Sequence, residues 1–249
     1  MKTSLREIIA TAGLAGVFVT GLGAVRAADL AVKAPVLKAP PPAYSWTGCY
    51  AGGFVGYAAA NDWNVTDING VNPGGVSSFP FTVGSQATGG ATVGCNWQPV
   101  SMFVLGVEGE GGYLNVAGNV AQPQIPGSSA PFGTVGEAAK IGSGYGLIAA
   151  RAGVAFDRLL IYGKLGVAVY DTSASVTAGD IVASGSKSQS PLAVGLGGEY
   201  AIYDHWSGKA EWVMFERGSS FDVCATAGAC WKQDPSTVQT FKVGLNYKW

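Results

Sequence analysis

Apolar and polar side chains alternate along eight stretches of this sequence, and a period of two is the pattern of a β-strand whose faces meet different surroundings. The clearest stretch is residues 237–249, where Phe241, Val243 and Leu245 share one face and Lys242 and Asn246 the other. The predicted strands cover residues 46–58, 86–98, 103–113, 148–156, 161–170, 192–202, 209–214 and 237–249. About ten alternating residues let a tilted strand cross a bilayer. The pattern predicts an all-β fold, an eight-stranded antiparallel up-and-down transmembrane β-barrel.

The connections between these strands alternate between short and long. Short turns at residues 98–101, 157–158 and 203–205 follow the second, fourth and sixth strands, whereas the other links are long and rich in Gly, Pro and Ser. This is the plan of an outer-membrane barrel, with long loops outside the cell and both termini in the periplasm. Residues 79–83 and 180–183 could extend strands beyond the membrane.

The composition excludes several other classes of protein. Only 12% of the residues are charged and 38 of 249 are glycine, which is too little charge for an ordinary water-facing surface. Beyond the N-terminal segment, no uncharged apolar run is long enough for a membrane helix. A soluble barrel of the lipocalin type is the alternative fold, but its outer face would need many more charges. The net charge of −1 indicates no nucleic-acid partner. With one His and no CxxC pair, neither a metal nor a cofactor is expected.

The N-terminal residues are predicted to be a targeting segment. Lys2 and Arg6 precede an apolar run over residues 8–23, and Val25 and Ala27 provide small side chains before a cut at Ala28. Residues 1–27 are therefore expected to be a secretory signal peptide, with a retained membrane anchor as the alternative. The proline-rich residues 28–45 are expected to form a periplasmic linker, and residues 46–249 the barrel.

The charges inside the predicted strands all fall on the face opposite to the large apolar side chains. They are Glu108, Glu110, Arg151, Lys164, Glu199, Lys209, Glu211 and Lys242. A charge facing lipid near the bilayer midplane costs about 2–4 kcal/mol, so these side chains are expected to point inward. The interior of an eight-stranded barrel is only wide enough for side chains. The sequence therefore predicts a lumen filled by ion pairs, in which Arg151 and Lys164 meet the glutamates.

The four cysteines are expected to pair in an oxidising compartment. Cys224 and Cys230 lie close together in the last long loop and can close a small ring there. Cys49, near the start of the first strand, and Cys95, near the end of the second, share the lipid-facing parity, so an antiparallel hairpin would bring them opposite one another. Free thiols at Cys49 and Cys95 are the alternative, because a thiol tolerates an apolar face.

Several segments, taken in order, resemble a known protein family. They are AADLAVKAP, YSWTGCYAGGFVGY, GGATVGCNWQ, FVLGVEGEGGY, RAGVAFDRLLIYGKLGVA, VGLGGEYAIYDHWSGKAEW and KVGLNYKW. Together they resemble the small porin-like or immunogenic outer-membrane proteins of alphaproteobacteria, related in fold to opacity proteins and to the membrane domain of outer-membrane protein A. The sequence departs from this pattern at Cys49 and Cys95, which are often aromatic there, and at Trp249, where such barrels most often end in Phe.

The resemblance implies a location in the bacterial outer membrane, in contact with its lipid and lipopolysaccharide. It also implies that the closing strand, with Tyr247 and Trp249, is recognised by the barrel-assembly machinery. The expected function is that of a structural, surface-exposed protein that contributes to envelope integrity and surface contact, with a surface partner that the sequence does not identify. A narrow diffusion pore for small solutes is the alternative.

Four short patterns suggest other chemistry, and each has a simpler interpretation. His205 and Ser207 have the His-x-Ser spacing of outer-membrane lipid-A deacylases, but His205 falls in a short periplasmic turn, so no enzyme is expected. Glu108 and Glu110 could form a glycosidase pair, but the basic residues on the same face favour ion pairs. Residues 184–187 (SGSK) match S-x-x-K without its companion motifs and are interpreted as loop. Residues 142–146 (GSGYG) precede no predicted helix, so they are not interpreted as a phosphate-binding loop.

Overall fold

The computed structural model describes residues 44–69, 78–122, 135–178, 181–226 and 228–249, so the predicted signal peptide and most of the predicted linker lie outside the described residues. The strands are β1 (Gly48–Ala60), β2 (Asp62–Asp67), β3 (Ser78–Thr82), β4 (Ser85–Trp97), β5 (Phe103–Tyr113), β6 (Val116–Gln122), β7 (Val135–Phe156), β8 (Leu159–Ala178), β9 (Ile181–Gln189), β10 (Leu192–Ala201), β11 (Trp206–Phe215), β12 (Phe221–Cys224), β13 (Cys230–Asp234) and β14 (Val238–Lys248). Within these ranges, no helix is long and apolar enough to cross a membrane.

Eight of the strands form a closed ring in the order β1, β4, β5, β7, β8, β10, β11 and β14, and β14 returns to pair with β1. Every neighbouring pair in this ring is antiparallel. The closing register is continuous, from Tyr50 opposite Lys248 to Ala60 opposite Val238. The predicted eight-stranded antiparallel barrel is therefore confirmed.

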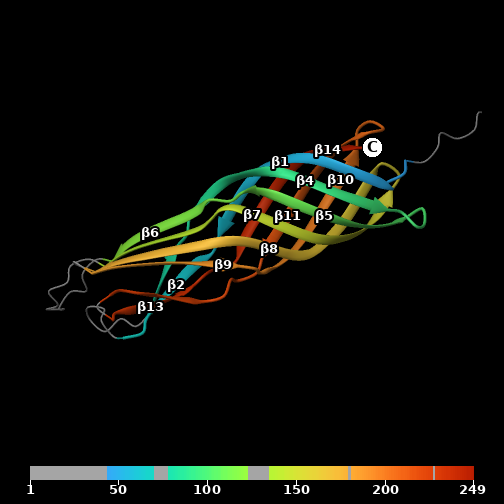
Figure 1. Ribbon diagram of the computed structural model, residues 1–249. Coiled ribbons are helices and arrows are strands. Elements are labelled where there is room, and N and C mark those ends of the chain that lie inside the picture. Colours follow the sequence, from blue (N-terminus) through green and yellow to red (C-terminus); the bar gives the residue numbers. More distant parts are fainter. Residues whose placement is uncertain (1–43, 70–77, 123–134, 179–180, 227) are drawn as a thin grey trace, which may run out of the picture. The chain divides into compact units, whose positions relative to one another are not determined.

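The sheet continues beyond one end of the ring as an extension, which consists of β2, β3, β6, β9, β12, β13 and the outer parts of β7 and β8 (residues 135–141 and 172–178). Figure 1 shows β2, β6, β9 and β13 grouped away from the C-terminus. β7 and β8 have 22 and 20 residues and run past the predicted strand ends at 148 and 170. β6 and β9 flank them, and β12, β13, β2 and β3 form a second sheet.

Most of the extension was predicted to be loop, and that prediction was wrong. Only β3 and the start of β9 match the possible continuations predicted at residues 79–83 and 180–183. β2 and β12 alternate apolar and polar residues but have only six and four residues, respectively, and β13 has only five. β6, β9 and the outer parts of β7 and β8 consist mainly of Ser, Ala, Thr, Gly and Val, so their two faces differ little in hydrophobicity and the period of two is weak. Pairing with long neighbours makes them strands despite this weak pattern.

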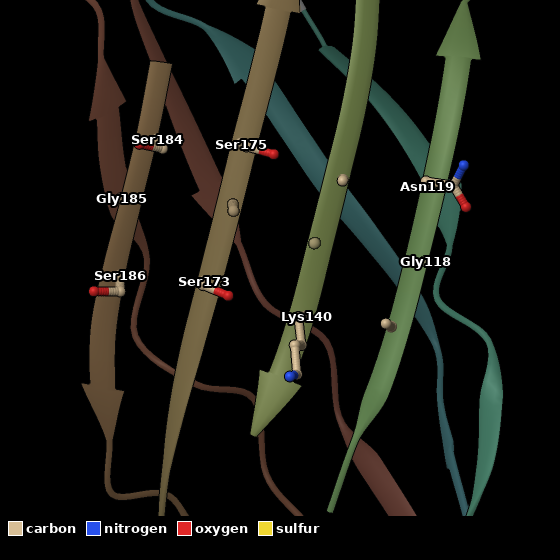
Figure 2. A pocket seen from close by; sticks show the side chains of 12 residues that line it. Gly118, Asn119, Lys140, Ser173, Ser175, Ser184, Gly185 and Ser186 are labelled. Carbon is tan, nitrogen blue, oxygen red and sulfur yellow. The ribbon is translucent and has the colours of Figure 1, made fainter. Parts of the chain in front are cut away.

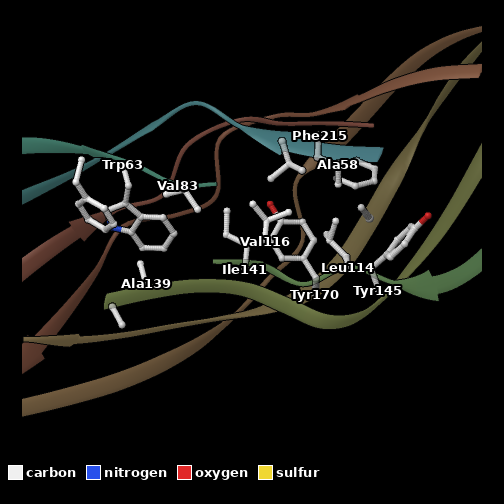
Figure 3. Close-up of a cluster of buried hydrophobic side chains, with 14 of the residues drawn as sticks. Ala58, Trp63, Val83, Leu114, Val116, Ala139, Ile141, Tyr145, Tyr170 and Phe215 are labelled. Atoms are coloured by element: carbon white, nitrogen blue, oxygen red, sulfur yellow. The ribbon is translucent and has the colours of Figure 1, made fainter. Parts of the chain in front are cut away.

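The inside of the extension is packed with apolar side chains (Figure 3). Trp63 and Val65 of β2, Val116 of β6, Ile141 of β7 and Val176 of β8 are each 0% exposed. Burying an apolar side chain of this size stabilises a fold by roughly 1.5–3 kcal/mol. The extension therefore has a buried apolar core, which continues into the ring through Phe54, Leu147 and Val213.

β7 passes from the ring into the extension through an irregularity between Ile141 and Tyr145. Gly142 has a φ of 64° there, a left-handed conformation that glycine adopts without steric cost. A Cβ atom at this position would lie 2.6 Å from the Leu114 carbonyl oxygen. The GSGYG pattern of residues 142–146 therefore lies at a β-bulge inside a strand.

The outer face of the ring is apolar, as the parity of the strands predicts. Large side chains there are exposed, for example Ile148 (77%) and Leu196 (64%). Trp97, Trp206 and Trp249 are also exposed, at the strand ends near the C-terminus. An apolar band with aromatic side chains at its border is typical of a barrel wall in lipid, because so much apolar surface is not stable in water.

Deletion of residues 247–249 is expected to prevent stable barrel formation, whereas Trp249→Phe is expected to have no effect. Lys248 N donates to His205 O (2.8 Å) and Trp249 N donates to Cys49 O (3.1 Å), so the chain end pairs with both neighbouring segments. Without these residues, backbone groups would be unsatisfied in lipid at a cost of several kcal/mol each. Outer-membrane levels and heat-modifiable gel mobility measure the outcome. Normal mobility of the deletion variant would contradict the prediction.

Candidate functional site

The eight predicted lumen residues all lie inside the ring, on six of its strands. They are Glu108 and Glu110 on β5, Arg151 on β7, Lys164 on β8, Glu199 on β10, Lys209 and Glu211 on β11, and Lys242 on β14. None of them is more than 6% exposed. Alternate residues of a barrel strand point inward, so side chains that are distant in sequence meet in the lumen.

Glu108 lies at the centre of this group. Its Oε2 is 3.1 Å from Arg151 Nη1 and 3.3 Å from Lys209 Nζ, and its Oε1 pairs with Lys164. Lys164 Nζ is in turn 2.8 Å from Glu211 Oε1. One carboxylate thus contacts three cations that come from three different strands.

The ion pairs continue from this centre to the remaining acids and bases. Glu110 pairs with Lys242, and its Oε2 is 3.7 Å from Lys164 Nζ. Glu211 Oε2 is 3.3 Å from Lys209 Nζ. Four carboxylates and four cations are therefore joined in one balanced network, and this balance compensates for their removal from water.

The end of the network near the C-terminus is completed by neutral polar groups. Arg151 Nη2 is 2.8 Å from Glu199 Oε2. The other oxygen, Glu199 Oε1, accepts hydrogen bonds from Ser207 Oγ (2.5 Å) and Asn246 Nδ2 (2.8 Å). Both oxygens of this buried carboxylate are therefore satisfied, as burial requires.

Three buried tyrosines that sequence reasoning did not assign to the network also belong to it. The hydroxyls of Tyr50, Tyr145 and Tyr162 donate to Glu108, Glu110 and Glu211, respectively. The Arg151 guanidinium lies 3.8 Å from the centroid of the Tyr162 ring, a cation–π contact. Parity places Tyr50 and Tyr162 on the inner face, but their partners depend on the stagger of the strands, which the sequence pattern does not give.

Three of the carboxylates have oxygens within 4.8 Å of one another, which is close enough to hold a cation: Glu108, Glu110 and Glu211. Lys164 makes ion pairs with all three, so an ammonium group already provides the positive charge at this position. A glycosidase would instead need space for a sugar between Glu108 and Glu110. The geometry therefore favours ion pairs over a metal site or an acid pair.

Residues just before β1 cover the mouth of the ring at the end near the C-terminus. Trp46 is 2% exposed and belongs to a buried cluster with Val104 and Leu160. Its Nε1 donates to Asp157 O (3.1 Å), and the Tyr44 ring meets it edge-on with 5.0 Å between centroids. The sequence pattern assigned Trp46 to the first strand and Tyr44 to the linker. A period of two indicates the two faces of a strand, but it does not indicate which side chains close the end of a barrel.

The patterns with catalytic spacing do not bring their residues together in the described chain. His205 is exposed in the turn before β11, whereas Ser207 is buried and donates to Glu199. Ser184 and Lys187 lie on β9, so the interpretation of this segment as loop was wrong. A spacing of three along a strand places these two side chains on opposite faces.

Both predicted disulfides are present. Cys49 of β1 is bonded to Cys95 of β4, which lies directly opposite in the register. Cys224 of β12 is bonded to Cys230 of β13 in the same way. All four cysteines are therefore paired, and the alternative of free thiols at Cys49 and Cys95 was wrong.

One acidic side chain lies in the core of the extension, outside the lumen network. Glu137 of β7 is 3% exposed, and its Oε1 accepts from Gln233 Nε2 (2.8 Å). Gln233 Oε1 accepts in turn from Trp63 Nε1 (2.8 Å), so these bonds link β7 with β13 and β2. Burial raises the pKa of Glu137 to about 7. Sequence reasoning missed Glu137 because it lies in a segment that was predicted to be loop.

A closed antiparallel ring with an apolar outside and a charged inside is the architecture of outer-membrane barrels. Residues 17–248 match the family described as outer membrane protein beta-barrel domain, so the chain belongs to this family. The protein is therefore a Gram-negative outer-membrane β-barrel protein, and the lipocalin alternative was wrong.

Its relatives include outer-membrane immunogenic proteins. The chain is 29% identical over 250 residues to the 31 kDa outer-membrane immunogenic protein of Brucella melitensis biotype 1, and equally to that of Brucella suis biovar 1, covering 95% of this chain and 97% of each relative. The predicted resemblance to alphaproteobacterial outer-membrane proteins is thus confirmed. The crystal structure of OprG from Pseudomonas aeruginosa matches the fold with a TM-score of 0.50 at 13% identity, covering 83% of this chain and 99% of that one.

Arg151→Met is expected to destabilise the barrel by roughly 3–5 kcal/mol, because it leaves the buried Glu199 without the cation it pairs with and removes one of the three cations around Glu108. The double variant Arg151→Met/Glu199→Gln should recover part of this loss, since one of these carboxylates is then neutral. Urea unfolding in lipid vesicles measures both. Arg158→Met is the control, because Arg158 is half exposed and 4.0 Å from Asp204, and it should cost less than about 1 kcal/mol. Equal losses for the two arginines would contradict the prediction.

Glu137→Gln is expected to remove a pH dependence from the stability of the extension. The pKa of Glu137 is about 7 in the folded protein against an ordinary value of 4.5, so the folded state holds the proton more tightly. The resulting stabilisation, roughly 3 kcal/mol, is complete below the ordinary pKa and is lost as the pH rises through 7. Glutamine has no such proton and can still accept from Gln233.

Hydrogen exchange of the β2, β6 and β13 amides, measured at about pH 5 and pH 8, tests this prediction. Protection in the wild type should fall at the higher pH relative to the Glu137→Gln variant. Glu216→Gln, which changes an exposed acid, is the matched control and should behave as the wild type. If amide protection changed with pH in the same way in all three proteins, protonation of Glu137 would not contribute to the stability of the extension.

Proposed function

We propose that this protein is a structural, surface-exposed component of the outer membrane that contributes to envelope integrity and surface contact. The filled lumen carries this proposal. Eight charged side chains and three tyrosines occupy the inside of the ring, and Trp46 lies in its mouth. The apolar core of the extension continues the filling at the other end. Such an interior favours a structural role over a narrow diffusion pore.

The proposal includes an orientation, with the extension outside the cell and both termini in the periplasm. The short turns lie on the side of the C-terminus, and the long strands lie on the other side, which is the usual arrangement of bacterial barrels. In this orientation the barrel wall contacts membrane lipid and lipopolysaccharide, and the extension is the part that meets the surroundings. The closing strand β14, with Tyr247 and Trp249, is available in the periplasm to the barrel-assembly machinery.

The proposal assigns no enzymatic activity to the chain. The buried hydroxyl of Ser207 is engaged with Glu199, and the lumen acids are engaged with lysines and Arg151. A nucleophile or general acid needs access to a substrate and a base in hydrogen-bond reach. These engaged groups support a role in stability.

Planar-bilayer recordings test the structural role against the pore. The wild-type barrel is expected to give no large, steady single-channel currents, because its lumen charges and aromatic side chains fill the ring. Heat-modifiable gel mobility of the same reconstituted sample shows that the barrel is folded in the bilayer, so an absence of currents then reports a closed lumen. Steady currents from the wild type would overturn the structural role in favour of the diffusion pore.

A further inference from the structure

The outer face of the extension carries a hollow that the proposed function does not use. The hollow crosses β6, β7, β8 and β9 and has a volume of about 670 Å³ (Figure 2). It is lined by two rows of directly opposed residues, Ala117, Lys140, Ser173 and Ser186 in one and Asn119, Ala138, Ser175 and Ser184 in the other. These side chains point outward, because Ala139 and Ala174, which lie between them, and Ala183, which precedes Ser184, are buried.

The polar groups of the hollow are free to bind another molecule. Figure 2 shows Ser173 and Ser175 on one strand and Ser184 and Ser186 on the next, with Lys140 beside them. None of these five side chains makes a hydrogen bond or an ion pair within the described residues. A second hollow of about 420 Å³ shares Lys140, Ser173 and Ser186 with the first and continues to Asp171 and Ser188, which are hydrogen-bonded to each other. Free hydroxyls around an unpaired ammonium provide a site for a polar, anionic group.

The height of the hollow suggests which molecule it meets. On β8, Val169 is 54% exposed on the lipid-facing side, and Ser173 lies on the same face four residues further along. For a tilted strand this distance corresponds to roughly 10 Å along the membrane normal. Lys140 and the serines therefore stand just above the hydrocarbon, at the level of the outer head groups.

We propose that this hollow binds the phosphorylated inner sugars of a neighbouring lipopolysaccharide molecule, with Lys140 at a phosphate and the four serines at sugar hydroxyls. This inference rests on the proposed orientation of the barrel. The hollow contains no aromatic or large apolar side chain, which the centre of a protein interface would use as an anchor. A weak site is sufficient here, because the ligand is held in the same membrane at a high effective concentration.

Binding of deacylated, phosphorylated inner-core oligosaccharide to the full mature protein tests the site. The protein is held in phospholipid nanodiscs that contain no lipopolysaccharide, and affinity is measured by titration of amide chemical shifts. Lys140→Gln is expected to weaken binding about tenfold, as is enzymatic removal of the phosphates from the oligosaccharide. Lys232→Gln, which changes another exposed lysine of the extension, is the control and should leave the affinity unchanged.

Three results would overturn the inference: no binding by the wild type, equal losses for Lys140→Gln and Lys232→Gln, or full competition by equimolar inorganic phosphate, which would indicate an anion site without sugar recognition. A separate experiment tests the orientation. All native cysteines are paired, so Ser78→Cys, at the exposed start of β3 and outside the hollow, introduces a single free thiol, which an impermeant maleimide should label on intact cells. Absence of labelling would overturn the orientation and the lipopolysaccharide site together, whereas labelling without oligosaccharide binding would overturn only the site.

Discussion

The structure depends on one constraint, which is that a ring of eight strands must keep every charged group away from lipid in a lumen with room only for side chains. The solution is a network in which each acid meets a cation from another strand. Glu108 contacts Arg151, Lys164 and Lys209, and these come from three strands, the neighbouring β7 and β8 and the more distant β11. Because removing one member leaves another charge buried and unpaired, the network also fixes the stagger of the strands that carry it. Charge balance and strand register therefore depend on each other.

The polar and apolar faces of the barrel wall are exchanged where the wall leaves the membrane, and β8 shows this within one strand. In the ring its inner face carries Lys164, while Leu165 and Val167 are exposed outside. In the extension its inner face carries Val176, which is fully buried, while Ser173 faces out. Lipid requires an apolar outside and tolerates a paired polar inside, whereas water requires the opposite arrangement. The same alternate positions of β8 face inward in the ring and in the extension, and only the residue types at these positions change. One continuous sheet can therefore lie partly in lipid and partly in water.

This inversion also explains how much of the fold could be predicted. In the ring, a large apolar side chain such as Leu165 alternates with a charge or a glycine, and the strong contrast revealed all eight strands and all eight lumen charges. In the extension, small apolar residues follow one another or alternate with Ser, Gly and Asn, and the weak contrast led to a prediction of loops for residues 116–122 and 184–189, which are strands. Trp46, the tyrosine hydroxyl bonds and Glu137 could not be predicted, because each depends on which segments meet across the interior. A single strand pattern gives the direction of a side chain and no information about its partner.

The pairing of β1 with β14 joins segments close to the two ends of the barrel sequence, and such long-range pairing is slow because the intervening chain must be ordered first. The Cys49–Cys95 bond fixes β1 to β4 near the mouth where this pairing ends. Cys49 O also accepts the backbone hydrogen bond from Trp249, so the disulfide holds one of the groups that the last residue must find. On the other side of β14, His205 O accepts from Lys248 N. On the β1 side, the final strand therefore meets an edge that a disulfide holds in register, and this reduces the number of ways in which the barrel can close.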